Sequence, residues 1–90
     1  MTRKQKTAEA SLLRKGFVQH ETDHSYFVYY TLDGKKSRAK TKTSHGNREL
    51  NKFLLGAMAK QVKLSKKDFL DLIDCPLDRE GYEAKAGDRL

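Results

Sequence analysis

The chain has 90 residues, 37% of them hydrophobic, and a net charge of +7. This length suits one small domain with a single two-layer core and excludes two cores. One cysteine, Cys75, excludes an internal disulfide and a thiolate zinc cluster. The charged first residues lack the apolar stretch of a signal peptide, and no later run is long enough to span a bilayer. We therefore expect a soluble, cytoplasmic protein that does not cross a membrane.

The positive charge is unevenly distributed along the chain. Residues 1–67 contain 16 Lys/Arg against 5 Asp/Glu, whereas residues 68–90 contain 3 against 7. A basic body favours polyanionic partners, with nucleic acid first and an anionic membrane surface second. A lysine-rich surface can also serve solubility alone, so charge by itself does not identify the partner.

The first predicted element is a short helix over residues 7–15. Thr7 can cap it, and Leu12 and Leu13 supply an apolar stripe. Gly16 stands where a residue in the left-handed conformation commonly ends a helix. The pattern therefore predicts that the helix stops before this glycine.

Residues 17–20 then form a short strand, and residues 22–46 form a β-hairpin. An aromatic run over residues 26–30 leads to Asp33-Gly34, and the returning run has five cations and no acid. Asp-Gly between two β-prone runs is the strongest short-range hairpin signal, because both residues accept the positive φ that such turns need. The three strands form an antiparallel meander.

Side chains of the returning strand alternate between its two faces. One face carries the cations Lys36, Arg38, Lys40 and Lys42, and the other carries the small residues Ser37, Ala39, Thr41 and Thr43. We expect the cationic face to contact phosphate and the small face to pack inward. Tyr26 is expected to join the cations, because an exposed aromatic ring can stack on an unpaired base.

Two registers of the hairpin are possible. A two-residue turn leaves His24 on the small-residue face. A three-residue loop with a bulge instead brings Lys42 opposite His24 and Lys40 opposite Tyr26. Only the second register builds an active site from the hairpin alone, and the sequence does not decide between them.

The best-defined helix is predicted over residues 50–62. Its apolar positions recur at helical spacing: Leu50, Phe53, Leu54, Ala57, Met58 and Val62. We expect this stripe to lie in the core. Gly56, inside the helix, costs about 1 kcal/mol relative to alanine and is expected to allow a close approach to the sheet.

A further helix is predicted after Ser65, where Ser65 and Asp68 resemble a capping box. Its apolar residues are Phe69, Leu70, Leu72 and Ile73. Pro76 ends this helix by disfavouring helical geometry at the preceding residue. Residues 77–90 are polar and are expected to fray towards the end.

The predicted order of elements is α-β-β-β-α-α. Three antiparallel strands need one face covered, and the flanking amphipathic helices can cover it. We therefore predict an α+β fold with a small three-stranded antiparallel sheet and helices packed on one face, like a double-stranded-RNA-binding domain. It would form a single domain over residues 1–90, with a core at about 7–75 and a polar tail at 77–90.

Four short stretches between residues 8 and 75 share the pattern of a known family. They are Leu12-Leu13-x-x-Gly16-Phe17, Asp23-His24-Ser25-Tyr26, Asp33-Gly34-Lys35-Lys36 and Ser44-His45-Gly46. With these stretches the chain resembles the HicA toxins of bacterial and archaeal toxin-antitoxin pairs. The resemblance implies an mRNA interferase with a double-stranded-RNA-binding-like fold, in which His24 is needed for RNA cleavage and a HicB antitoxin blocks the site. That family usually reads Gly-Ser-His where this chain reads Thr22-Asp23-His24.

RNA cleavage needs a base for the 2′-OH proton, an acid for the leaving 5′-oxygen, and positive charge near the phosphate. Histidine suits the first two roles because its ordinary pKa lies close to neutral pH. We expect His24 to act as the general acid or base. His45 is a candidate second proton carrier in the first register, where it lies opposite Thr22. Otherwise His20 and His45 are expected to be ordinary surface residues.

No cofactor is expected, and three scattered histidines without a carboxylate-histidine spacing give no metal site. Three functions are compatible with this sequence. The first is a metal-independent endoribonuclease toxin that cleaves mRNA and is silenced by a HicB-like antitoxin. The second is a non-catalytic RNA-binding module with the same fold. The third is a protein-interaction domain whose cations meet an acidic partner.

Overall fold

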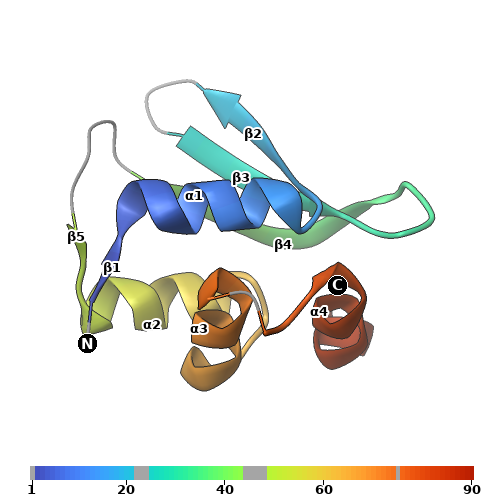
Figure 1. Ribbon diagram of the computed structural model, residues 1–90. Coiled ribbons are helices and arrows are strands. Elements are labelled where there is room, and N and C mark those ends of the chain that lie inside the picture. Colours follow the sequence, from blue (N-terminus) through green and yellow to red (C-terminus); the bar gives the residue numbers. More distant parts are fainter. Residues whose placement is uncertain (1, 22–24, 44–48, 75) are drawn as a thin grey trace.

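The computed structural model describes residues 2–21, 25–43, 49–74 and 76–90, and these form an α+β fold (Figure 1). The elements are β1 (Arg3–Lys4), α1 (Gln5–Arg14), β2 (Phe17–Glu21), β3 (Ser25–Tyr30), β4 (Lys36–Thr43), β5 (Glu49–Leu50), α2 (Lys52–Gln61), α3 (Lys66–Asp74), α4 (Arg79–Ala86) and a 3₁₀ turn (Gly87–Arg89). Strands β2, β3 and β4 form an antiparallel sheet in that order, and β1 pairs with β5. The predicted fold class, a three-stranded antiparallel sheet with helices, is confirmed.

The helices pack on one side of the three-stranded sheet. In Figure 1, α1 crosses the sheet and α2, α3 and α4 lie below it, so the upper side of the sheet faces away from the helical layer. The buried inner face of the sheet carries Phe17, Phe27, Tyr29 and Ala39. Each large apolar side chain buried there contributes about 1.5–3 kcal/mol relative to exposure. Because the helices cover only one face of the sheet, the other face is open to contact a partner.

Helix α1 begins earlier than predicted. Residues before it are held extended, because β1 pairs with β5 and sets Arg3 opposite Leu50. The helix therefore starts at Gln5 without a side-chain cap, and the predicted cap at Thr7 is wrong. Gly16 follows the helix with a φ of +96°, which confirms its predicted left-handed role.

Helix α2 buries a different face from the one predicted. Its buried residues are Leu55, Met58 and Ala59, and Val62 is buried just beyond its end. The predicted core positions of Met58 and Val62 are therefore confirmed, whereas Phe53, Leu54 and Ala57 are exposed. The predicted apolar positions and the buried ones both have helical spacing. The two stripes overlap, but the middle of the buried one is moved along by about one residue, which is a rotation of about 100° around the helix. Asn51 caps the helix by accepting a hydrogen bond from the N–H of Leu54, and Leu50 is buried in β5. The expected core roles of Phe53, Leu54 and Ala57 are therefore wrong.

Helix α3 agrees with the sequence. The hydroxyl of Ser65 accepts a hydrogen bond from the N–H of Asp68 at 3.2 Å, which is one half of the predicted capping box. All of its predicted apolar residues are buried: Phe69, Leu70, Leu72 and Ile73. The helix ends at Asp74, two residues before Pro76.

The C-terminal residues include a packed helix, so the expectation that the core ends at about residue 75 and is followed by a polar tail is wrong. Asp78 caps α4 by accepting a hydrogen bond from the N–H of Gly81 at 2.7 Å. Tyr82 is fully buried, lies edge-on to Tyr29 with ring centroids 4.7 Å apart, and donates a hydrogen bond to the carbonyl of Val62 at 2.8 Å. The core therefore extends through α4.

Helix α4 also holds the end of the β3–β4 hairpin. The Arg79 guanidinium donates hydrogen bonds to the carbonyls of Tyr30 at 3.0 Å and Thr31 at 3.2 Å. The N–H of Leu32 donates to the carboxylate of Glu83 at 2.8 Å. These bonds hold the hairpin end against α4.

Candidate nucleic-acid interface

Strand pairing places the cations of β4 on the sheet face that points away from the helices. The four predicted cations, Lys36, Arg38, Lys40 and Lys42, are all exposed, whereas Ala39, Thr41 and Thr43 are buried and Ser37 is half-buried. The predicted alternation of this strand is therefore confirmed. The contact of the cations with phosphate stays a prediction.

Next to the loop the hairpin has the second predicted register, with Tyr30 opposite Lys36, but it departs from that register further along the strands. A five-residue loop, residues 31–35, joins the strands and is closed by a 2.8 Å hydrogen bond from its first N–H to its last carbonyl. A β-bulge before Tyr30 then shifts the pairing, so that Lys42, not Lys40, lies opposite Tyr26. Bulges insert extra residues into one strand and displace everything beyond them. The even-numbered cations still share the face of Tyr26, as the second alternative expected.

One row of side chains crosses all three strands on this open face. His20 of β2 pairs with Tyr26 of β3, which pairs with Lys42 of β4. The Nζ atom of Lys40 lies 5.4 Å from the centroid of the Tyr26 ring, a cation–π distance. An imidazole, a phenol ring and two ammonium groups therefore lie side by side.

A shallow hollow of about 280 Å³ lies beside this row. It is lined by His20, Tyr26, Val28, Lys36 and Lys40. Val28 is almost fully buried although it belongs to the open face, and its position beneath longer side chains makes the floor of the hollow apolar. Pockets for drug-sized ligands begin at roughly 300 Å³. The hollow is therefore suited to a small group such as one base or one sugar-phosphate unit.

The electrostatics of the open face favour anions. Among the described residues of β2, β3 and β4, the side chains on this face are apolar, aromatic, imidazole or cationic, and none is a carboxylate. Glu21 of β2 pairs with Ser25, whose side chain is buried on the opposite face. Four cations on a face where the described strand residues include no acid create the positive potential that attracts phosphate.

The predicted catalytic residue lies outside the described residues, and so does His45. The structure therefore brings together five of the six predicted site residues, Tyr26 and the four cations of β4, and does not describe His24.

Sequence reasoning assigned no role to His20, which the structure places on the open face. The alternation of side chains along β2 indicates on which face His20 lies. Phe17 points inward, and the two-residue period of a strand puts His20 on the opposite face. The sequence does not give the register between β2 and β3, and it is this register that sets His20 opposite Tyr26.

Within residues 2–21, 25–43, 49–74 and 76–90, no group of three or more His, Cys, Asp or Glu side chains is arranged to hold a metal ion. None of the described helices is both long enough and apolar enough to span a bilayer. No protein family, curated protein or solved structure matches this chain.

Proposed function

We propose that this chain binds single-stranded RNA on the open face of β2, β3 and β4 and cleaves it as a metal-independent endoribonuclease. The observation that supports the proposal best is the row of His20, Tyr26 and Lys42 beside Lys40. Aromatic rings flanked by cations are the usual platform for unpaired bases and their phosphates.

Cleavage requires proton transfer in addition to binding. We propose His24 as the general acid or base, on the strength of the HicA-like stretch Asp23-His24-Ser25-Tyr26. The 2′-OH of RNA is the nucleophile, so the protein supplies only proton transfer and charge stabilisation. The ammonium groups of Lys40 and Lys42 would stabilise the charge that builds on the phosphate.

The same resemblance supplies the biological setting of the proposal. The chain would be a toxin that acts on mRNA in the cytoplasm and is silenced by a HicB-like antitoxin. A protein that covered the open sheet face would block both the cations and the hollow, which gives a direct route to inhibition.

The alternative function is a non-catalytic RNA-binding module. The exposed cations of β4 beside Tyr26 support this function as well, because binding RNA on the sheet face does not require His24. Binding and cleavage therefore need separate tests.

The binding test neutralises two cations of the sheet face. We expect Lys40→Gln with Lys42→Gln to weaken binding of a fluorescent single-stranded RNA about tenfold at low salt and to reduce its salt dependence, because two phosphate contacts are lost. The matched control is Lys52→Gln with Lys66→Gln, which removes the same charge from exposed or half-buried positions elsewhere. Equal binding by the two double variants would rule out the sheet face as the interface.

The cleavage test compares wild type with His24→Ala in excess EDTA, with Lys52→Gln plus Lys66→Gln, away from the sheet face, as the control. We expect wild type and this control to cut RNA and His24→Ala to cut it 10²- to 10⁴-fold more slowly, about the contribution of general acid–base catalysis. All three should bind RNA alike. If none of them cuts while all bind, the non-catalytic module is the correct function.

A further inference from the structure

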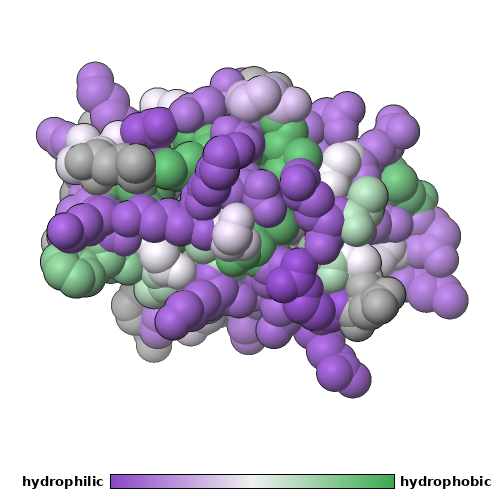
Figure 2. Space-filling model, turned by 90° about the horizontal axis from the view of Figure 1, so that it is seen from below, coloured by the Kyte–Doolittle hydropathy of each residue, from purple (hydrophilic) through white to green (hydrophobic). Residues whose placement is uncertain are grey.

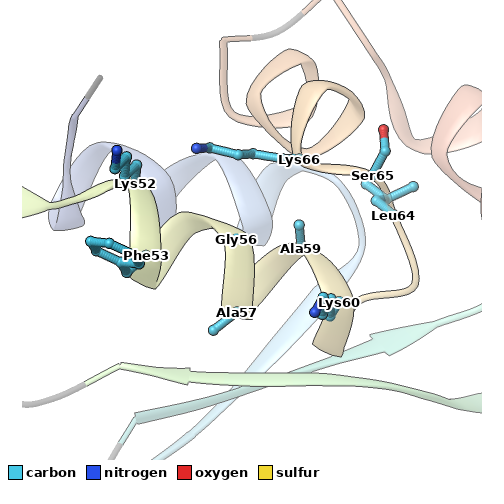
Figure 3. A pocket seen from close by; sticks show the side chains of 9 residues that line it. All are labelled: Lys52, Phe53, Gly56, Ala57, Ala59, Lys60, Leu64, Ser65 and Lys66. Carbon is cyan, nitrogen blue, oxygen red and sulfur yellow. The ribbon is translucent and has the colours of Figure 1, made fainter.

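A second surface feature lies on the helical layer, away from the open sheet face. It is a groove of about 550 Å³ between α2 and the start of α3 (Figure 3). Its lining consists of Lys52, Phe53, Gly56, Ala57, Ala59, Lys60, Leu64, Ser65 and Lys66. None of these residues belongs to the proposed RNA-binding face.

The apolar part of the groove combines exposed residues of α2, Phe53 and Ala57, with Ala59 and Leu64, which are buried in the core. Phe53 is 77% exposed, more than any other large hydrophobic residue that the structure describes. Gly56 leaves the middle of the groove open, since a Cβ built there would have no atom within 4 Å. The expected role of Gly56 in bringing α2 close to the sheet is therefore wrong. Figure 2 shows the helical side from below, where hydrophobic side chains in green emerge among hydrophilic ones in purple.

The rim of the groove is cationic. Lys52 and Lys60 come from α2, and Lys66 extends from the start of α3 across α2 towards Lys52 (Figure 3). None of the three forms an ion pair with a described residue, and none of the described residues that line the groove is an acid. An occupant of this groove must therefore offer apolar surface in the middle and negative charge at its edges.

We propose that this groove binds an acidic amphipathic helix of a partner protein. Helix-in-groove recognition places apolar side chains at i, i+3/i+4 and i+7 against a hydrophobic groove, and Phe53 with Ala57 supplies the exposed apolar surface here. The acidic residues of the partner helix would meet Lys52, Lys60 and Lys66. Aromatic residues in interfaces commonly carry much of the binding energy, and Phe53 is the anchor in this one.

A nucleic acid fits this groove less well than it fits the sheet face. Alanine, glycine and leucine form most of the floor, and they offer neither hydrogen-bond donors for phosphate nor a set of rings for bases. The proposal is independent of RNA binding and cleavage, because it uses no residue of β2, β3 or β4.

The test is a selection from a displayed library of random 14-residue peptides on the wild-type protein, with removal of peptides that also bind Phe53→Ala. We expect enrichment of acidic sequences with apolar residues at helical spacing. For a synthesised, fluorescent member of that set, Phe53→Ala should raise Kd at least tenfold. Lys52→Gln with Lys66→Gln should raise it more at low salt than at high salt, because exposed charges are screened.

The control for lost apolar surface is Leu32→Ala, which truncates another residue that is 52% exposed, in the hairpin loop. It should bind the peptide as wild type does. Phe53→Ala should keep the wild-type melting temperature and RNA affinity, which separates this result from a failure of the RNA proposal. The proposal is overturned if no peptide is enriched, if the enriched peptides are not acidic, if RNA displaces them, or if sedimentation shows that a second copy of the chain fills the groove.

Discussion

The hydroxyl of Tyr29 donates a hydrogen bond to the carboxylate of Glu83 at 2.6 Å, which ties the centre of the sheet to α4. The same carboxylate oxygen accepts the N–H of Leu32, so one side chain holds both β3 and the hairpin loop. The Arg79 guanidinium lies 5.8 Å from the centroid of the Tyr29 ring. Tyr29 and Glu83, which are 54 positions apart in the sequence, are thereby held together beneath the open face.

Removing this hydroxyl should destabilise the fold. We expect Tyr29→Phe to lower the free energy of unfolding by about 1.5–3 kcal/mol, the typical contribution of a hydrogen bond to a charged group. Urea denaturation at neutral pH measures the change. Tyr30→Phe, a half-buried neighbour on the other face, is the control and should have a much smaller effect. A loss as large in the control would contradict the assignment.

The same bond makes stability depend on alkaline pH. Burial, followed by the hydrogen bond to Glu83, raises the pKa of Tyr29 from 10.0 to about 12. Because the folded-state pKa is raised, the contribution of Tyr29 is fully present below pH 10 and is lost as the pH rises through about 12. We therefore expect the free energy of unfolding of wild type to fall more steeply over this range than that of Tyr29→Phe. Parallel curves for the two proteins would be inconsistent with this linkage.

Tyr82 is the test of whether α4 belongs to the core. Tyr82→Ala removes a fully buried ring that contacts Phe17 and Tyr29, and it leaves the Val62 carbonyl without its donor. We expect a loss of about 3–5 kcal/mol, as for other large aromatic residues truncated in a core. Glu80→Ala, an exposed change in the same helix, should stay within about 0.5 kcal/mol of wild type. Thermal and urea unfolding distinguish the two outcomes.

Gly16 is needed for two separate reasons. Its φ is +96°, and a Cβ added there would lie 2.4 Å from Nε of Arg79. We expect Gly16→Ala to cost at least about 1–2 kcal/mol from backbone strain, with the contact added to that. When Gly16→Ala is combined with Arg79→Ala, the cost of the contact should disappear while the cost of backbone strain stays. A double-mutant cycle of the two changes should therefore give a non-zero coupling energy. Strict additivity would mean that the side chain moves away without cost.

Lys63 offers the opposite case, a site where glycine should stabilise. It has a φ of +68° in the turn that ends α2. There the N–H of Leu64 donates to the carbonyl of Ala59 and the N–H of Lys63 donates to that of Lys60, the paired bonds of a Schellman motif. We expect Lys63→Gly to raise the free energy of unfolding by about 0.5–1 kcal/mol. Lys60→Gly, inside the helix, should lower it by about 1 kcal/mol, and equal signs for the two changes would contradict the motif.

The sequence alone predicted those features that depend on neighbouring residues. The hairpin follows from Asp33-Gly34, and the cationic face follows from the alternation of β4, because a period of two needs no knowledge of the rest of the chain. The end of α1 at Gly16 and the start of α3 after Ser65 were equally local. The four cations of the candidate interface could therefore be placed on one face in advance, whereas the face of Tyr26 depended on the register of the hairpin.

The tertiary structure decided what depends on distant contacts. The bulge before Tyr30 set the cross-strand partners, and the β2–β3 register brought His20 beside Tyr26. Two stripes on α2 had helical spacing, and packing against the sheet chose the one that leaves Phe53 outside. Tyr82 lies in a polar stretch whose local pattern predicts fraying, and only the aromatic cluster with Phe17 and Tyr29 makes its burial favourable. Periodicity fixes which residues share a face, whereas register and burial depend on the whole core, which no local stretch of the chain contains.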